Sequence, residues 1–175
     1  GLSIEAGAGL GKTRLLDEAR RIGAERGFTV LSGRGTELER DFTCGVVRQL
    51  LEGPLAALPE GERERVLEGA QAARTALGLE RGETQELDPF NVLHDLYWVT
   101  AALADRGPLM LAIDDAHWAD VTSLDYLSFL LPRLAEMRVL LLVAVRVDEP
   151  EQPLGLARVL ADPELRHLSP APLSE

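Results

Sequence analysis

The chain has 175 residues and a formal net charge of −11, with 18 Lys and Arg against 29 Asp and Glu. This length predicts a single domain, and a hydrophobic content of 46% is typical of globular rather than disordered proteins. The acidic balance argues against this segment holding nucleic acid or an anionic membrane through its net field. The single cysteine, Cys44, excludes an internal disulfide framework and a cysteine metal cluster, and predicts a buried thiol.

The sequence predicts neither a membrane span nor a secretory signal peptide. The strongly apolar stretches at 109–113 and 139–145 are far shorter than the roughly 20 residues of a membrane span. The chain has no secretory signal peptide and no initiating Met, and it begins directly in an apolar strand. We therefore expect one cytoplasmic domain, residues 1–175, truncated at both ends and cut from a longer protein.

The first third predicts a strand, a glycine-rich loop, a helix and a second strand. Residues 1–6 form a short apolar run, 13–26 have a helical apolar period that Gly27 stops, and 28–32 are rich in β-forming residues. Such a βαβ unit places its two strands parallel with a right-handed crossover.

The middle third, about 41–106, predicts a helical insert. One helix is expected over 45–58 with a kink or break at Gly53-Pro54, and a second over 62–77. The polar stretch 78–87 is expected to be a loop. A third helix should begin with Asp88 as the N-cap and Pro89 in the first helical position, and should end near Arg106.

The last third returns to strands. Residues 109–113 and 138–145 are continuously apolar, which is typical of parallel strands covered on both faces by helices. Between them a helix is expected over about 122–136, capped by Asp120 or Thr122. A short helix around 155–161 and an edge strand at 166–168 complete an α/β domain.

The stretch from Ala6 to Thr13 reads AGAGLGKT and fits the pattern GxxxxGK[ST], with alanine in the first glycine position. Its glycines let backbone N–H groups turn inward around a phosphate chain, and the following helix adds its positive N-terminal end. Lys12, which is the only lysine in the chain, is expected at the β- and γ-phosphates, and the Thr13 hydroxyl on Mg²⁺. The expected nucleotide-binding residues are Gly7, Ala8, Gly9, Leu10, Gly11, Lys12, Thr13 and Arg14.

Two adjacent carboxylates follow the apolar run 109–113, at the end of the strand where open α/β sheets bind ligands. Asp114 is expected to hold Mg²⁺ together with Thr13. Asp115 is a candidate catalytic residue that orients or deprotonates an attacking water, although a second acid can also be structural.

Arg146 closes the next apolar strand and is a candidate γ-phosphate sensor, the alternative being a solvated strand-end arginine. Together with Lys12 and Asp115 it makes up the expected catalytic set. His117 and Trp118 are more typical of loop and packing positions. Arg34 and Glu37 follow the second strand, where they either approach the site or form a surface ion pair.

Taken together, GAGLGKTRLL, GRGTELERDFTCGVVRQLL, LAIDDAHWADVTSLDYLSFLLPRL and VLLLVAVR closely resemble the P-loop ATPase domain of large LuxR-type transcriptional regulators. These belong to the STAND class of signal-transduction ATPases, near the AAA-like ATPases, and are abundant in actinobacteria. The resemblance covers nearly the whole chain and implies a three-layer α/β/α sandwich whose parallel sheet has the order 5-1-4-3-2. It also implies an ATP/ADP switch with Walker A at 6–13, Walker B at 109–115 and a sensor arginine, Arg146, ending the strand 138–146.

The same resemblance implies partners beyond these 175 residues. Such regulators bind DNA through a C-terminal helix-turn-helix, so no direct nucleic-acid contact is expected from this fragment, while nucleotide-dependent self-association is possible in the family. Two other readings stay open: a nucleotide-gated scaffold with negligible hydrolysis, and the same module attached to a cyclase or kinase. A GTPase is excluded, because an NKxD-type guanine motif needs a second lysine.

Overall fold

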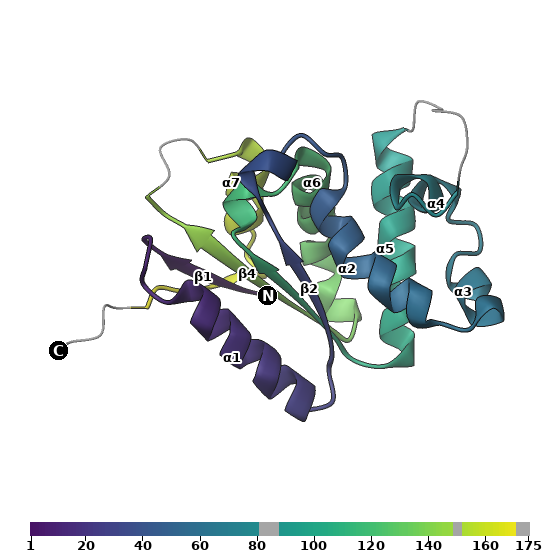
Figure 1. Cartoon of the computed structure of the whole chain (residues 1–175), viewed down its shortest axis with the longest axis horizontal. Helices are drawn as coiled ribbons and strands as arrows, with labels where there is room; N and C mark the ends of the chain where they lie inside the picture. The colour runs from purple at the N-terminus through teal and green to yellow at the C-terminus, as the bar shows by residue number, and fades with distance from the viewer. Residues whose placement is uncertain (81–87, 149–151, 171–175) are drawn as a thin grey trace.

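The computed structural model describes residues 1–80, 88–148 and 152–170, and its centre is a parallel sheet (Figure 1). The strands are β1 (Leu2–Ala6), β2 (Thr29–Arg34), β3 (Leu109–Asp114), β4 (Val139–Arg146) and β5 (Arg166–Leu168). They lie side by side in the order β5-β1-β4-β3-β2, and every neighbouring pair is parallel. The predicted order 5-1-4-3-2 is therefore confirmed, as is the α/β class.

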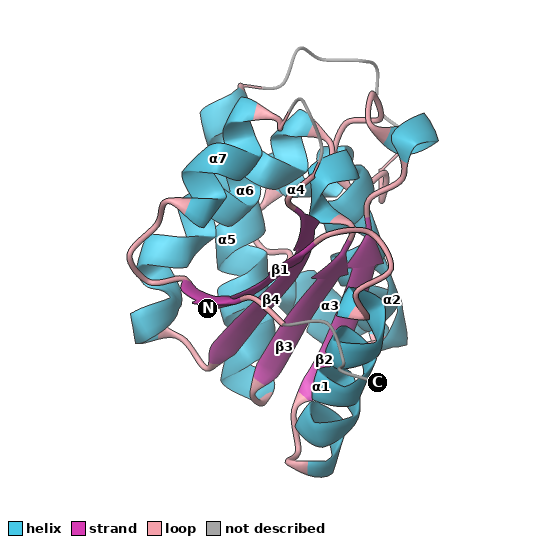
Figure 2. Cartoon of the chain, turned by 90° about the vertical axis from the view of Figure 1, so that its left-hand side faces the viewer, coloured by secondary structure: helices cyan, strands magenta, loops and turns pink. Residues whose placement is uncertain are grey.

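Helices cover both faces of the sheet. The α-helices are α1 (Lys12–Glu25), α2 (Gly45–Ala57), α3 (Glu60–Val66), α4 (Gln71–Ala76), α5 (Pro89–Arg106), α6 (Val121–Leu130) and α7 (Leu154–Leu160). Short 3₁₀ helices are η1 (Glu37–Glu39), η2 (Ala116–Trp118) and η3 (Leu131–Glu136). In Figure 2, α1 lies on one side of the strands, whereas α5, α6 and α7 lie on the other.

The two faces have separate apolar cores, which explains why β3 and β4 are continuously hydrophobic. On one face, Leu16 of α1 packs with Ile4, Met110 and Leu142 of the sheet. On the other, a larger cluster joins the sheet to α2, α5, α6 and α7. All six residues of β3 are buried, so the strand that ends in Asp114 is held from both sides and gives its last residues a fixed position.

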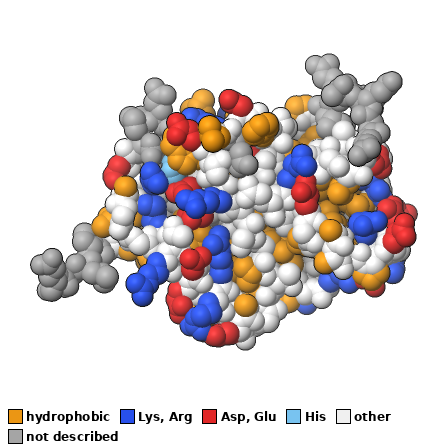
Figure 3. All heavy atoms as spheres, viewed as in Figure 1, with side chains coloured by type: hydrophobic (Ala, Val, Ile, Leu, Met, Phe, Trp, Pro, Cys, Tyr) orange, Lys and Arg blue, Asp and Glu red, His pale blue; other side chains and the backbone are white. Residues whose placement is uncertain are grey.

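The outer face of α1 is polar. Figure 3 shows Lys or Arg and Asp or Glu side chains interspersed over this helix, and Arg20 and Arg21 pair with acids three or four residues away. Among the residues described, no helix combines the length and the apolarity that crossing a membrane would require. Cys44 is completely buried, as expected, and burial together with the charge of Asp120 raises the pKa of its thiol to about 12.

The single helix predicted over 62–77 is wrong. This segment forms α3 and α4 instead, because Gly69 between them has a φ of 74°, a left-handed conformation that stops a helix. The helix predicted over 45–58 is present as α2, and Pro54 does not break it, since α2 continues to Ala57. The helix predicted over about 122–136 is also present, as α6 followed directly by η3, which ends at Glu136.

Other element predictions hold, some with shifted ends. The second strand begins at Thr29 and extends to Arg34, two residues beyond the predicted end. Asp88 caps α5 by accepting a hydrogen bond from the Phe90 N–H at 2.8 Å, with Pro89 next to it as predicted. Asp120, rather than Thr122, caps α6. Most of the loop predicted at 78–87 lies outside the described residues.

Candidate functional site

The carboxyl ends of the four longer strands meet at one edge of the sheet. Parallel pairing places Ala6 of β1 beside Arg146 of β4, and Arg34 of β2 beside Asp114 of β3. The glycine loop, both predicted aspartates and the predicted arginine therefore converge at this edge, where α/β sheets bind ligands.

The glycine loop runs from Ala6 to Gly11 between β1 and α1. Gly9 and Gly11 have φ of 78° and 79°, which a side chain would disfavour. A Cβ on Gly7 would lie 2.4 Å from the Asp148 carboxylate, so this position is closed to any larger residue while Asp148 stays in place. Gly11 also serves as the N-cap of α1 and offers no side chain to cap it, which leaves the first N–H groups of the helix available to an anion.

Lys12 lies beneath this loop and is 6% exposed. Its Nζ donates to the carbonyl oxygens of Ala6 at 2.8 Å and Gly7 at 2.7 Å. Burial, and then the positive charge of Arg146, lower the pKa of Lys12. The site therefore favours an added anion, because a negative group near Nζ would offset both effects.

Thr13 and Asp114 form the direct link between α1 and the sheet. The Thr13 hydroxyl donates to Asp114 Oδ2 at 2.9 Å, across 101 residues of sequence. The other carboxylate oxygen, Oδ1, accepts the Asp115 N–H at 2.9 Å. A hydroxyl and a buried carboxylate thus face each other at the mouth of the glycine loop.

Asp115 has a left-handed backbone with φ 46° and is 6% exposed. Arg34 donates to its Oδ2 from Nη2 at 2.8 Å and from Nε at 3.2 Å. On the other oxygen, Oδ1, the Nε of Arg146 lies at 3.7 Å and the Nε2 of His117 at 4.0 Å. Asp115 directly follows β3 and is therefore flanked by two arginines from the strands on either side, Arg34 of β2 and Arg146 of β4.

These groups border an open hollow of about 460 Å³. It is lined by Gly9, Gly11, Lys12, Thr13, Arg14, Asp17, Arg34, Asp115 and Arg146. Of the residues predicted from sequence, Gly7, Ala8 and Leu10 belong to the same loop without lining the hollow, and Asp114 lies behind Thr13. The remaining predicted residues, which are Gly9, Gly11, Lys12, Thr13, Arg14, Asp115 and Arg146, all line this one hollow.

Arg34, for which the sequence allows either the site or a surface ion pair, lies at the site and bonds Asp115. The strand predicted over 28–32 would leave Arg34 outside the sheet, whereas β2 continues through it. A parallel pairing of 29–34 with 109–114 would have placed Arg34 beside Asp114. Of the other residues that follow these strands, His117 is buried next to Asp115, whereas Glu37 is exposed. Trp118 packs against the Arg40 guanidinium, whose Cζ lies 5.9 Å from the centre of the ring.

The donor set fits a magnesium nucleotide. Hydroxyl and carboxylate oxygens are the ligands that Mg²⁺ takes in proteins, usually one or two beside phosphate and water, and Thr13 with Asp114 supplies such a pair. The glycine cradle, the uncapped start of α1, and Lys12 supply N–H groups and positive charge for phosphate oxygens.

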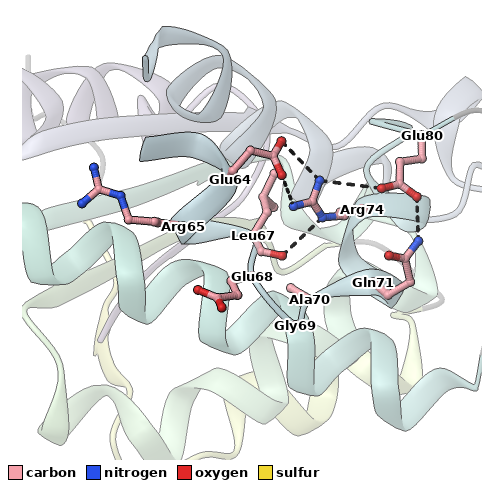
Figure 4. A pocket seen from close by; sticks show the side chains of 9 residues that line it. All are labelled: Glu64, Arg65, Leu67, Glu68, Gly69, Ala70, Gln71, Arg74 and Glu80. Carbon is pink, nitrogen blue, oxygen red and sulfur yellow. Dashed lines mark hydrogen bonds and ion pairs between the residues drawn. The ribbon is translucent and has the colours of Figure 1, made fainter. Parts of the chain in front are cut away.

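A second open hollow, of about 590 Å³, lies on the turn between α3 and α4, away from this edge. Figure 4 shows Arg74 at its centre, pointing toward Glu64 and Glu80. Arg74 pairs with Glu64 at 2.6 Å and Glu80 at 3.6 Å, and also donates to the Leu67 carbonyl. Because its charge is balanced by two carboxylates, this hollow resembles an ion-pair network that joins α3 to α4 rather than an anion site.

Residues 3–143, most of the chain, match the AAA ATPase domain family. The chain belongs to this family. Membership in the AAA ATPase domain family agrees with the glycine loop and the Thr13–Asp114 pair, and supports a nucleotide-binding ATPase module. Among curated proteins, none matches the chain significantly.

The solved structures that match this chain are distant from it in sequence. A chain in the structure of Drosophila ORC bound to AT-rich DNA and Cdc6 has 17% identity over 95% of this chain, with a TM-score of 0.46. The cytoplasmic domain of the Thermomonospora curvata Type VII secretion ATPase EccC has 16% identity over 93%, with a TM-score of 0.41. This chain covers 47% of the first and 17% of the second, so it spans less than half the length of either.

Proposed function

We propose that this chain is the ATP-binding, slowly hydrolysing switch module of a larger signal-transduction protein, and that residues 1–175 act as one domain within it. The observation that carries the proposal is the 2.9 Å contact between the Thr13 hydroxyl and Asp114, with Lys12 buried beneath the same loop. Such an arrangement serves phosphate and a divalent cation together. Membership in the AAA ATPase domain family supports it.

In this proposal each group has a defined task. The glycine loop and Lys12 hold the β- and γ-phosphates, with Gly7, Ala8, Leu10 and Arg14 completing the loop's contribution to nucleotide binding. Thr13 and Asp114 hold Mg²⁺, which when bound would neutralise phosphate charge.

Asp115 and Arg146 act on the terminal phosphate. Asp115 orients the attacking water and accepts its proton, while Arg146 senses the γ-phosphate and balances charge that develops there. Their 3.7 Å separation means that a γ-phosphate drawing Arg146 away changes the surroundings of Asp115 at once. ATP and ADP can thereby set two different states of the same edge.

The parent protein in this proposal is a cytoplasmic LuxR-type regulator of the STAND class. The support is the sequence block 109–120, which reads LMLAIDDAHWAD, together with the resemblance over the remaining motifs. A net charge of −11 suits a module that leaves DNA to a separate helix-turn-helix domain. The module is also proposed to self-associate in a nucleotide-dependent way. An alternative parent protein carries the same module attached to a cyclase or kinase domain.

A second candidate is a nucleotide-gated scaffold with negligible hydrolysis. One observation favours it: Arg34 occupies Asp115 Oδ2 with two hydrogen bonds, so that this oxygen is not open to water. In this reading Asp115 and Arg34 form a structural pair, and ATP binding alone sets the assembly state.

The substitution Asp115→Asn separates the two candidates. For a hydrolysing switch we expect ATP turnover to fall by about 100-fold or more, with Mg·ATP affinity nearly unchanged. Turnover is followed as phosphate release, and affinity by calorimetry. Turnover at background in both wild type and Asp115→Asn, with ATP still bound, would contradict hydrolysis and support the scaffold.

A further inference from the structure

Asp120 is a buried acid outside the proposed nucleotide site. It is 3% exposed and stands at the end of the turn that begins with Asp115. A buried carboxylate is costly unless its oxygens are hydrogen-bonded, so its partners show what it holds together.

Each carboxylate oxygen of Asp120 accepts two hydrogen bonds, one from the start of α2 and one from α6. Oδ1 accepts the Cys44 N–H and the Ser123 N–H, both at 2.9 Å. Oδ2 accepts the Val46 N–H at 3.2 Å and the Ser123 hydroxyl at 2.5 Å. Asp120 therefore caps α6 and the start of α2 at the same time, which is more than an N-cap needs.

The segment between Asp115 and Asp120 is held on its other side by Gly35, just past the end of β2. A Cβ on Gly35 would lie 2.5 Å from the Asp115 carbonyl oxygen and 2.7 Å from the Ala119 nitrogen. The Gly35 N–H also donates to the Asp114 carbonyl at 3.0 Å. The turn is thus fixed between β2 and α2, and it has little room to move while Asp120 is bonded.

Two residues that Asp120 links, one before α2 and one at the start of the turn 115–119, have a strained backbone. Within the described part of the chain, Cys44 and Asp115 are the non-glycine residues with positive φ, at 61° and 46°. Such conformations persist when the surroundings over-determine them. Asp120 bonds directly to the N–H of Cys44 and terminates the turn that starts at Asp115, so one side chain supports both.

We propose that Asp120 is a positioning residue for Asp115, locking the turn 115–119 to the N-terminus of α2 so that the Asp115 carboxylate is aimed at the nucleotide. The inference rests on the proposed function, because it assigns Asp120 a part in the hydrolysis attributed to Asp115.

The test is Asp120→Asn, which keeps the side-chain shape but replaces one acceptor oxygen by an N–H₂ donor that faces other donors. We expect the turnover number to fall ~10- to 100-fold, as a small misplacement of a catalytic group does, while Mg·ATP affinity stays within ~2-fold. Ser123→Ala removes one of the four donors to Asp120 and also the acceptor of the Val47 N–H, which lies 3.1 Å from the Ser123 hydroxyl. Its turnover number should fall by less, and it replaces Asp120→Asn in the test if that variant folds poorly.

The matched control is Asp88→Asn, the same change at the N-cap of α5, where Asp88 accepts one hydrogen bond and is exposed. Its turnover should equal that of the wild type. Unchanged turnover in Asp120→Asn, or a fall matched by an equal loss of affinity, would overturn the positioning role while leaving the proposed ATPase standing.

A second readout does not depend on hydrolysis. The chain has two tryptophans, and in a Trp98→Phe background Trp118 reports on the turn itself. Asp120→Asn should shift Trp118 emission to longer wavelength and increase its quenching by acrylamide, with far-UV circular dichroism unchanged. Unaltered Trp118 emission would overturn the lock, even if the wild type proved not to hydrolyse ATP and the proposed function failed.

Discussion

At the residue scale, the site depends on a few cations that are not interchangeable. Lys12 is the only lysine of 18 basic residues, and it occupies the buried position where a compact ammonium meets two carbonyls of the glycine loop. Arg34 and Arg146 instead flank Asp115 from neighbouring strands, where a planar guanidinium can bridge several oxygens. The positive charge is thus carried by a compact ammonium under the glycine loop and by planar guanidinium groups beside Asp115.

The substitution Arg146→Ala tests the sensor role. Because Arg146 ends β4 beside the glycine loop, its loss should weaken ATP binding by about tenfold or more, the effect of one hydrogen bond to a charged group. ADP, which has no γ-phosphate, should keep its affinity. Calorimetry with both nucleotides measures the difference, and equal losses for ATP and ADP would contradict a γ-phosphate sensor.

Two buried glycines are expected to respond differently to alanine. Gly35→Ala should lower the free energy of unfolding by about 2 kcal/mol or more, because its Cβ would meet backbone atoms of Asp115 and Ala119 that cannot give way. Gly23→Ala should have little net effect, since the Cβ meets the flexible end of Met110 while the helix gains up to about 1 kcal/mol of propensity.

Urea unfolding of the two glycine variants measures this contrast. A Gly35→Ala protein as stable as the wild type would show that the close approach of β2 to the turn 115–119 is not required. Gly23→Ala serves as the matched control, because both changes add one methyl group to a buried glycine.

At the element scale, the edge strand β5 is tied to β1 by side chains as well as by pairing. Ser3 and Glu5 of β1 and His167 of β5 form a hydrogen-bonded group, with His167 Nδ1 at 2.5 Å from the Glu5 carboxylate and 3.0 Å from the Ser3 hydroxyl. Since β1 leads directly into the glycine loop, this group joins the last described strand to the site.

This group predicts a specific loss of stability in acid. Burial alone would raise the pKa of Glu5, but the hydrogen bonds from Ser3 and His167 outweigh it and lower that pKa below 4.5. The stabilising contribution is therefore complete above pH 4.5 and disappears as the pH falls through the lowered pKa. Its size should be at most about 1 kcal/mol, because His167 is half exposed.

Comparing the wild type with Glu5→Gln measures this contribution. The difference in unfolding free energy between the two should be constant near pH 6 and shrink toward zero as the pH falls well below 4.5. A difference that stays constant throughout, or grows in acid, would show that the ionised Glu5 carboxylate does not stabilise β5 on β1.

The helical insert shows the limit of sequence patterns at this scale. The apolar period Val66, Leu67, Ala70, Ala73 continues across the α3–α4 junction, and these side chains are indeed buried. The period therefore identified the buried face correctly but could not show that Gly69 takes a left-handed conformation there. At Pro54 the sequence signal favoured a break that does not occur, because proline destabilises a helix but does not always end it.

At the scale of the whole molecule, local signals predicted the parallel strands and the place of the site, whereas the order of the strands came from the resemblance to a known family. Continuous apolar runs predicted buried parallel strands, and AGAGLGKT with Asp114 predicted which edge would carry the chemistry. The meeting of Thr13 and Asp114 was predicted from the same motifs, but two other contacts between distant segments were not. The Arg34–Asp115 pair spans 81 residues and the double cap by Asp120 spans 76, and both depend on strand register and helix placement.

The central claim is that this edge binds Mg·ATP through Lys12, and calorimetric titration of the wild type and Lys12→Ala with Mg·ATP tests it most directly. The wild type should bind one nucleotide, and Lys12→Ala should bind at least about 100-fold more weakly, because it loses the buried charge that meets the phosphates. Circular dichroism should show both proteins folded. Equal affinity for Mg·ATP in the two folded proteins would contradict the assignment of the glycine loop as a nucleotide site.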